Sequence, residues 1–224
     1  ALQKGAAPGM QGSAKLEQIL GGEVYAAHRP VAGIVLAAGE SVRFGQPKQL
    51  LEWMGEPLVR RVTRISLGAG LSEVVVVTGS SRARVRQVLS GMPVKLVENL
   101  NWVEGQASSV RAGIRALQPR TGGVIFLLAD QPLVTTNLIK SLREEHARSL
   151  APIIAPMVDD RRGNPVLFDR NTFADLASLE GEAGGRTLFS KFRVHELTWH
   201  DQGVLFDVDT LEDYQQLLGR ELGG

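Results

Sequence analysis

The chain has 224 residues, a formal net charge of +1 at pH 7 and no cysteine; 43% of its residues are hydrophobic and 22% are charged. These values exclude a disordered chain, disulfides, thiolate catalysis and cysteine-ligated metals, and they suit a cytoplasmic globular protein. Because 25 basic residues are balanced by 24 acidic ones, a single nucleotide is a better anionic partner than a nucleic acid. No apolar run approaches the roughly 18 residues that a membrane span needs, so no membrane partner is expected.

Residues 1–30 are rich in Gly, Ala, Pro and Gln without a sustained period, which predicts a flexible tail or linker remnant before a domain at 31–220. From Val31 onward, short apolar runs alternate with helical patterns. Strands are predicted at 31–36, 73–78, 94–97 and 124–128, and helices at 57–67, 81–89, 106–117 and 135–148. This alternation predicts an α/β fold in three layers, with a mostly parallel sheet and helices on both faces.

The second half of the chain is less regular. Short strands at 153–155 and 165–168 flank the charged turn at 159–163, which predicts a β-hairpin added to the sheet. Further strands are predicted at 192–199 and 205–208, followed by a final helix at 211–218.

The loop after the first strand carries the strongest functional signal. It reads Leu36-Ala37-Ala38-Gly39-Glu40-Ser41-Val42-Arg43-Phe44-Gly45-Gln46-Pro47-Lys48. Its glycines allow close backbone approach, and its amides and two cations can bind a polyanion. The spacing differs from a P-loop, because Lys48 stands three residues after Gly45, and a G-x-G-x-x-G fingerprint is absent here. On its own, the loop could also be a turn with a solvated Arg and Lys.

The loop at 37–48 directly follows a predicted strand, and several other polar residues also stand directly after predicted strands. Ligands of open parallel sheets bind at the carboxyl ends of the strands, so the loop at 37–48, the pair Thr78-Gly79, Asp130 and Asp207 are expected to meet in one crevice. Asp130 ends an apolar run and could bind Mg²⁺, or it could cap the turn before Pro132.

Two more carboxylates, Asp207 and Asp209, lie two residues apart in a predicted strand and would share one face. We expect Asp207 to be the second metal ligand, while Asp209 and Thr210 mainly cap the last helix.

A glycine and short polar side chains also mark the start of the helix at 106–117. Gly105, Gln106, Ser108 and Ser109 would present free N–H groups and hydroxyls to a phosphate or to a base edge. Capping of the helix would explain the same residues equally well.

Together these segments resemble a known family. Leu-Ala-Ala-Gly-x-Ser-x-Arg-x-Gly-x-x-Lys at 36–48 is similar to the signature loop of the MobA-like NTP transferases, typified by molybdenum cofactor guanylyl- and cytidylyltransferases. Ala37-Ala38-Gly39 and the run Glu-Gly-Gln-x-Ser-Ser-x-Arg-x-Gly at 104–113 resemble the MocA-like cytidylyltransferase branch. Asp-Gln-Pro at 130–132 and Asp-x-Asp-Thr-x-Glu-Asp at 207–213 resemble further family motifs. The resemblance covers about 31–220 and implies a Rossmann-like nucleotidyltransferase fold.

The resemblance implies transfer of a nucleoside monophosphate, CMP above all, from CTP or another NTP to the terminal phosphate of molybdopterin or molybdenum cofactor. Pyrophosphate is released, Mg²⁺ is the cofactor, and a molybdenum hydroxylase would receive the product. Lys48, Arg43 and Asp130 would be catalytic, and Asp130 and Asp207 would hold the metal. The nucleotide would be bound by Leu36, Ala37, Ala38, Gly39, Ser41, Gly45, Thr78, Gly79, Gly105, Gln106, Ser108 and Ser109.

Two segments resemble the family's acceptor side. Gly163-Asn164-Pro165 is similar to a Gly-His-Pro step, although Asn164 cannot titrate as a histidine would. The loop at 181–186 resembles one that faces the pterin, and its Arg186 could bind the acceptor phosphate bidentately or simply lie on the surface at a helix start. Asn164, Pro165, Gly184 and Arg186 are therefore the expected acceptor-binding residues.

Two alternatives remain open. Pro47-Lys48-Gln49 is also similar to sugar-alcohol phosphate cytidylyltransferases of the IspD-like kind, which use a different acceptor. A non-catalytic, nucleotide-dependent chaperone of the molybdenum cofactor would bind the same molecules without releasing pyrophosphate.

Overall fold

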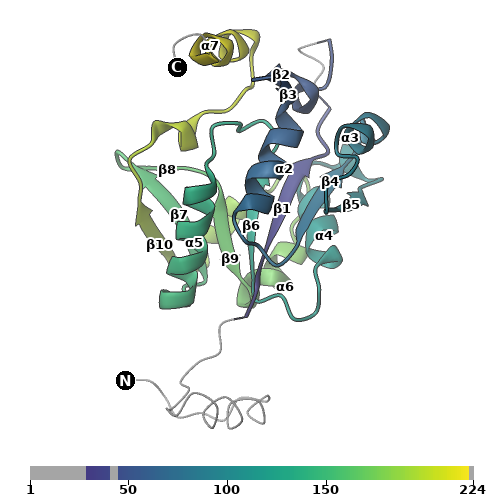
Figure 1. Ribbon diagram of the computed structural model, residues 1–224. Coiled ribbons are helices and arrows are strands. Elements are labelled where there is room, and N and C mark those ends of the chain that lie inside the picture. The colour runs from purple at the N-terminus through teal and green to yellow at the C-terminus, as the bar shows by residue number, and fades with distance from the viewer. Residues whose placement is uncertain (1–28, 41–44, 222–224) are drawn as a thin grey trace, which may run out of the picture.

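The computed structural model describes residues 29–40 and 45–221 (Figure 1). Within them, eight strands form one sheet in the order β10-β7-β9-β6-β1-β4-β5, with β8 paired to β7. The strands are β1 (Val31–Ala37), β4 (Val74–Thr78), β5 (Lys95–Glu98), β6 (Gly123–Leu128), β7 (Ile153–Val158), β8 (Arg161–Arg162), β9 (Val166–Asp169) and β10 (Val194–Thr198). Strands β5, β4, β1 and β6 are parallel neighbours, whereas β9 runs antiparallel to both β6 and β7.

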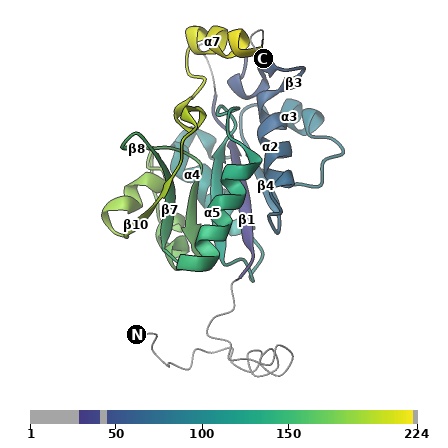
Figure 2. The ribbon, with the colours of Figure 1, turned by 60° about the vertical axis from the view of Figure 1, so that its left-hand side comes forward.

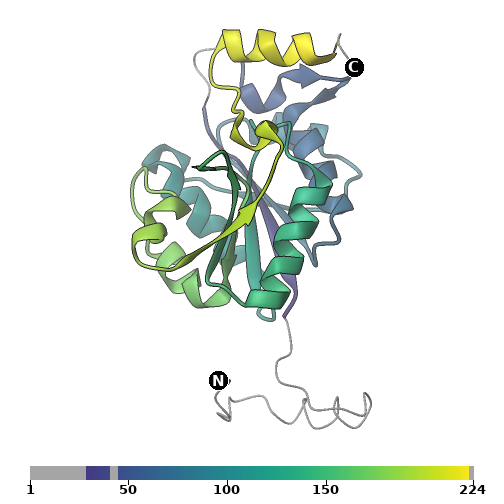
Figure 3. The same ribbon diagram turned by 90° about the vertical axis from the view of Figure 1, so that its left-hand side faces the viewer.

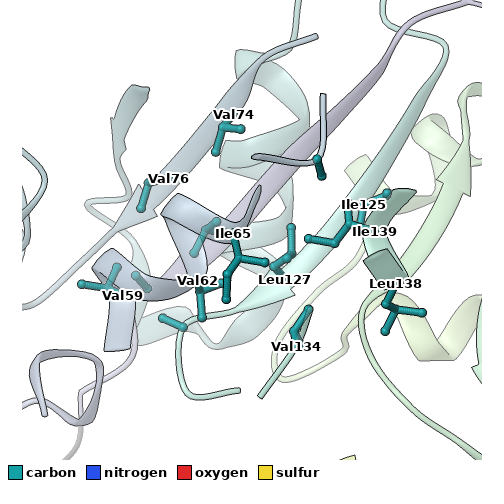
Figure 4. Close-up of a cluster of buried hydrophobic side chains, with 14 of the residues drawn as sticks. Val59, Val62, Ile65, Val74, Val76, Ile125, Leu127, Val134, Leu138 and Ile139 are labelled. Atoms are coloured by element: carbon teal, nitrogen blue, oxygen red, sulfur yellow. The ribbon is translucent and has the colours of Figure 1, made fainter. Parts of the chain in front are cut away.

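Helices cover both faces of this sheet, as the sequence predicts. They are α2 (Leu58–Gly68), α3 (Arg82–Val88), α4 (Gln106–Ala116), α5 (Thr136–Ser149) and α6 (Phe173–Ala177), whereas the last helix, α7 (Leu211–Glu221), lies off these faces. Alternate residues of β1 face opposite sides: Val35 packs into the cluster under α2 and α5, and Ile34 packs into the cluster under α4 and α6. Figure 4 shows the first of these clusters, with Val62 and Ile65 from α2 and Leu138 from α5. The predicted three-layer α/β fold is confirmed.

The expected β-hairpin is present in the second half. Strand β7 pairs with β8 through the turn at Asp159 and Asp160, which both have positive φ. Strand β7 also pairs with β9, and in this pairing Ile153 lies opposite Phe168. The predicted tail lies outside the described residues except for Arg29 and Pro30. No helix in the described part of the chain is long and apolar enough to cross a membrane.

The predicted strand at 205–208 is wrong. A 3-10 turn, Gln202–Leu205, occupies its start, and the chain then crosses the end of the sheet without joining it. One backbone bond fixes this crossing, from Val208 N to Asp130 O at 3.0 Å. A single bond replaces a strand ladder because the segment lies over strand ends rather than beside a strand edge.

A small outer layer, absent from the sequence-based expectations, covers the carboxyl ends of the strands. The antiparallel pair β2 (Glu52–Trp53) and β3 (Glu56–Pro57) lies under α7, as Figures 2 and 3 show. Trp53, Leu58 and Leu217 share one buried cluster, and Tyr214 Oη donates to Glu52 O at 2.7 Å. Pro57, expected as the first helical residue, lies instead in β3 and directly precedes α2.

Thr210 and Asp213 form the cap of α7. Asp213 N donates to Thr210 Oγ1 at 3.1 Å, and Thr210 N donates to Asp213 Oδ2 at 2.8 Å. This reciprocal pair is a capping box with Asp in the place of Glu. The expectation that Asp209 and Thr210 mainly cap the helix therefore holds for Thr210, whereas the Asp209 side chain bonds elsewhere.

We expect Asp213→Ala to lower the free energy of unfolding at pH 7 by about 1 kcal/mol, because the box is lost. The hydrogen bond from Thr210 Oγ1 lowers the pKa of Asp213, so this stabilisation is present above the unfolded carboxyl pKa. It should disappear as the pH falls below about 4. Urea denaturation of the wild type, Asp213→Ala and the neighbouring control Glu212→Gln, each at pH 7 and at a pH below about 4, measures the effect. An equal loss at both pH values would contradict this account.

Candidate active site

Two clefts open where β1 and β6 end. The first encloses about 440 Å³ and the second about 480 Å³. The two share Leu36, Gln106, Leu128 and Asp130 in their linings. The two clefts therefore adjoin at these side chains.

The first cleft lies between the loop after β1 and the start of α4. It is lined by nine residues that the sequence singled out: Leu36, Ala37, Ala38, Gly39, Lys48, Gly105, Gln106, Ser109 and Asp130. Ser41 and Arg43 lie outside the described residues. Gly45 has φ +64° and is exposed, but it is not part of either lining. The expected meeting of the loop at 37–48 with Asp130 is thus present.

Thr78 and Gly79 lie behind the loop rather than in the lining. Thr78 Oγ1 donates to Val97 O at 3.3 Å. A Cβ on Gly79 would lie 2.4 Å from Ala38 O and 2.9 Å from Trp102 Cβ, so only glycine fits between these two neighbours. Gly79 therefore permits β4 to support the loop closely.

The start of α4 is held by its own polar residues. Asn99 Nδ2 donates to Ser108 Oγ at 2.7 Å and to Ser109 Oγ at 3.0 Å. Ser108 Oγ in turn donates to Gly105 O at 2.8 Å. Ser108 therefore serves the helix end, while Ser109 also reaches the first cleft. Gly105 has φ +97°, and a Cβ there would lie 2.5 Å from Gly181 O.

Among the residues of this cleft that sequence reasoning did not assign to it are Gln49 and Glu182. Gln49 is buried, and its Nε2 donates to Ala37 O at 3.4 Å and to Gly39 O at 3.2 Å, which braces the loop. Its only signal was its place in Pro47-Lys48-Gln49. Glu182, in the loop expected to face the acceptor, lines the first cleft instead. The bond from Ala107 N to Gly181 O, 3.1 Å long, holds that loop against α4.

The second cleft lies over β6 and β9. Asn164, Gly184 and Arg186, three of the four predicted acceptor residues, line it together with Asp207 and Asp209. Pro165 is not part of the lining, and the Asn164–Pro165 peptide bond is cis. The floor of this cleft is apolar and includes Val110, Phe126, Val166 and Phe168. Among the described residues, Arg186 is the one cationic side chain of this lining, beside the carboxylates of Asp130, Asp207 and Asp209, so an anionic group would bind there at Arg186.

A lysine and three carboxylates stand at the junction of the clefts. Lys48 Nζ forms ion pairs with Asp130 and with Asp209, the latter at 2.8 Å. Burial alone would lower the pKa of Lys48, but the two carboxylates outweigh it and the net shift is upward. Lys48 is therefore a fixed positive charge at neutral pH.

Asp207 is the third carboxylate, and it accepts a hydrogen bond from Gln131 Nε2. Burial raises the pKa of Asp207, and the charges of Asp130 and Asp209 raise it further. Within the described residues, no three or more His, Cys, Asp or Glu side chains converge as a ready-made metal site. A cation at Asp130 would need additional ligands from water or from a bound phosphate, which is how Mg²⁺ is commonly held.

Comparison with known proteins identifies the family. Residues 33–197 match the MobA-like NTP transferase domain. Nicotine blue oxidoreductase of Paenarthrobacter nicotinovorans is 31% identical over 84% of this chain and 96% of its own length. A probable molybdenum cofactor guanylyltransferase of Bacillus cytotoxicus is 27% identical over 85% of this chain and 97% of its own.

A solved structure shows the same arrangement. The manganese complex of Rv0371c from Mycobacterium tuberculosis is 28% identical and superposes with a TM-score of 0.73, covering 85% of this chain and 98% of that one. Together, the domain match over most of the chain, the relatives of nearly full length and the shared fold show that this chain belongs to the MobA-like NTP transferase family.

Proposed function

We propose that the protein transfers a nucleoside monophosphate, CMP in the first instance, from an NTP to the terminal phosphate of a molybdopterin-type acceptor and releases pyrophosphate. One observation carries this proposal: the two clefts meet at Asp130, beside Lys48. Transfer between two bound reactants requires two sites whose reacting ends touch. Membership of an NTP transferase family supports the reaction class.

The first cleft suits the donor. Its loop, with Gly39 and Lys48, offers backbone amides and a cation to the triphosphate, while Ser109 and Gln106 at the start of α4 offer polar groups to the ribose or base. CTP is the preferred donor, and CMP the group transferred, because Ala37-Ala38-Gly39 resembles the cytidylyltransferase branch. GTP is the competing donor, because the Bacillus relative is named a guanylyltransferase.

The second cleft suits the acceptor. Its apolar floor matches a flat pterin ring, and Arg186 at its rim can bind a phosphate bidentately. An acceptor phosphate held by Arg186 on the side of Asp130 would face the donor's α-phosphorus. The nucleotide-bearing product would then pass to a molybdenum hydroxylase.

In this reaction the protein does not need to form a covalent bond to either substrate. An oxygen of the acceptor phosphate attacks the α-phosphorus in line, a new P–O bond forms, and the bond to pyrophosphate breaks. The phosphate is already deprotonated, so no general base is needed. Lys48 offsets the charge that builds on the α-phosphate and the leaving pyrophosphate. The loop after β1 and the start of α4 fix the position of the donor.

The residues present fit a divalent cation. The ammonium of Lys48 lies between the carboxylates of Asp130 and Asp209, so the junction already accommodates positive charge. Asp130 and Asp207 would hold Mg²⁺, which when bound would neutralise and align phosphate oxygens. The manganese complex of the mycobacterial relative supports use of a divalent ion.

We expect pyrophosphate release when the protein is given Mg²⁺, molybdopterin and CTP, with GTP, ATP and UTP giving less. A coupled pyrophosphate assay with each of the four nucleotides measures this directly. Nucleotide binding without pyrophosphate release would favour the chaperone alternative. Release with a sugar-alcohol phosphate in place of molybdopterin would favour the IspD-like alternative. Absence of release under all these conditions would overturn the proposed transfer.

We expect Asp130→Ala and Lys48→Ala each to reduce turnover by about 100-fold or more, because each removes a charge that acts on the reacting phosphates. Circular dichroism and the thermal midpoint would show that the fold survives. Lys140→Ala, which removes an exposed lysine from α5, is the matched control and should leave turnover unchanged. Near-normal turnover in either site variant would remove that residue from its role.

A further inference from the structure

Asp209 stands where a helix cap was expected, yet the cap is made without its side chain. The reciprocal bonds of Thr210 and Asp213 close the start of α7. The Asp209 carboxylate instead reaches across the junction to Lys48 Nζ at 2.8 Å. The capping box thus holds the backbone of Asp209 in place while its side chain serves the site.

The charges at the junction oppose a polyanion. The ammonium of Lys48 is shared between two carboxylates, those of Asp130 and Asp209, and Asp207 adds a third acidic group to the lining of the second cleft. A triphosphate approaching this group would meet net negative charge, although Lys48 is the residue expected to bind it. The lysine is therefore present but already neutralised.

We propose that Asp209 is a positioning residue that, together with Asp130, neutralises Lys48 at the junction of the two clefts until a divalent cation occupies Asp130. This inference rests on the proposed function. A cation on Asp130 takes that carboxylate from Lys48, whose ammonium then keeps Asp209 as its one partner. Asp209 comes from the segment that crosses the strand ends, so it keeps the ammonium at the junction of the two clefts.

Two opposite effects follow from removing the Asp209 charge. Without a metal ion, Lys48 would lose half of its neutralising partners and bind phosphates more tightly. With the metal ion, the ammonium would lose the group that keeps it at the junction, and turnover would fall. A purely structural role for Asp209 would weaken binding and turnover together.

The test compares wild type with Asp209→Asn in calorimetric titrations with inorganic tripolyphosphate and with CTP, in EDTA and in Mg²⁺. In EDTA we expect both probes to bind Asp209→Asn about tenfold more tightly, the scale of one unit charge at a partly exposed site. In Mg²⁺ we expect kcat to fall about tenfold or more without a rise in the KM for CTP. Glu212→Gln, the same loss of charge on the first turn of α7, should change neither measurement.

A double-mutant cycle separates action through Lys48 from direct repulsion of phosphate. Most of the gain in binding affinity that Asp209→Asn gives in EDTA should vanish when it is made in a Lys48→Met background. Asp209→Glu should keep the wild-type affinity and turnover. An undiminished gain without Lys48, or weaker binding by Asp209→Asn in EDTA, would overturn the inference. If the transfer reaction fails but the EDTA result holds, only the proposed function falls. If wild type binds neither probe with or without Mg²⁺, both fall.

Discussion

The ammonium group of Lys48, shared by the carboxylates of Asp130 and Asp209, connects three distant segments that form the site. Lys48 comes from the loop after β1, Asp130 from the end of β6, and Asp209 from the segment before α7. The side chains of Lys48 and Asp130 are largely buried, and buried charges are costly unless each keeps its partners. The geometry of the loop, the sheet end and the last helix is therefore linked through one side chain, although Lys48 and Asp209 are 161 residues apart.

The outer layer explains how such distant segments are held in register. The pair β2–β3 and helix α7 share a buried cluster that includes Trp53 and Leu217. The loop that ends in Lys48 leads through a 3-10 turn, Lys48–Leu50, into β2, so packing of α7 on this hairpin brings Asp209 to Lys48. The enzyme-like features of the chain thus depend on a small accessory layer as well as on the main sheet.

Much of the fold could be predicted because buried parallel strands read as apolar runs. Strands β1, β4 and β6 each have nearly every residue buried, and glycines or prolines separate them from helices. The meeting of Lys48 with Asp130 followed from the rule that loops gather at the carboxyl ends of the strands.

The parts of the fold and of the site that could not be predicted depend on contacts between distant residues, which no local sequence pattern encodes. The run 205–208 is apolar enough for a strand but has no strand edge beside it, so it crosses the sheet end instead. Asp209 looked like a cap because capping signals are local, while its bond to Lys48 is not. Gln49 gave no signal beyond its place in Pro47-Lys48-Gln49, since an amide that braces a loop from beneath is indistinguishable in sequence from a surface glutamine.

The shared lining of the two clefts has a consequence for what happens after the bond is made. Donor and acceptor would each occupy one cleft, but the dinucleotide formed from them would span both and keep the contacts of each. Such a product would leave more slowly than pyrophosphate. Turnover would then be governed by removal of the product, and a recipient enzyme that takes the product directly would increase the rate of turnover.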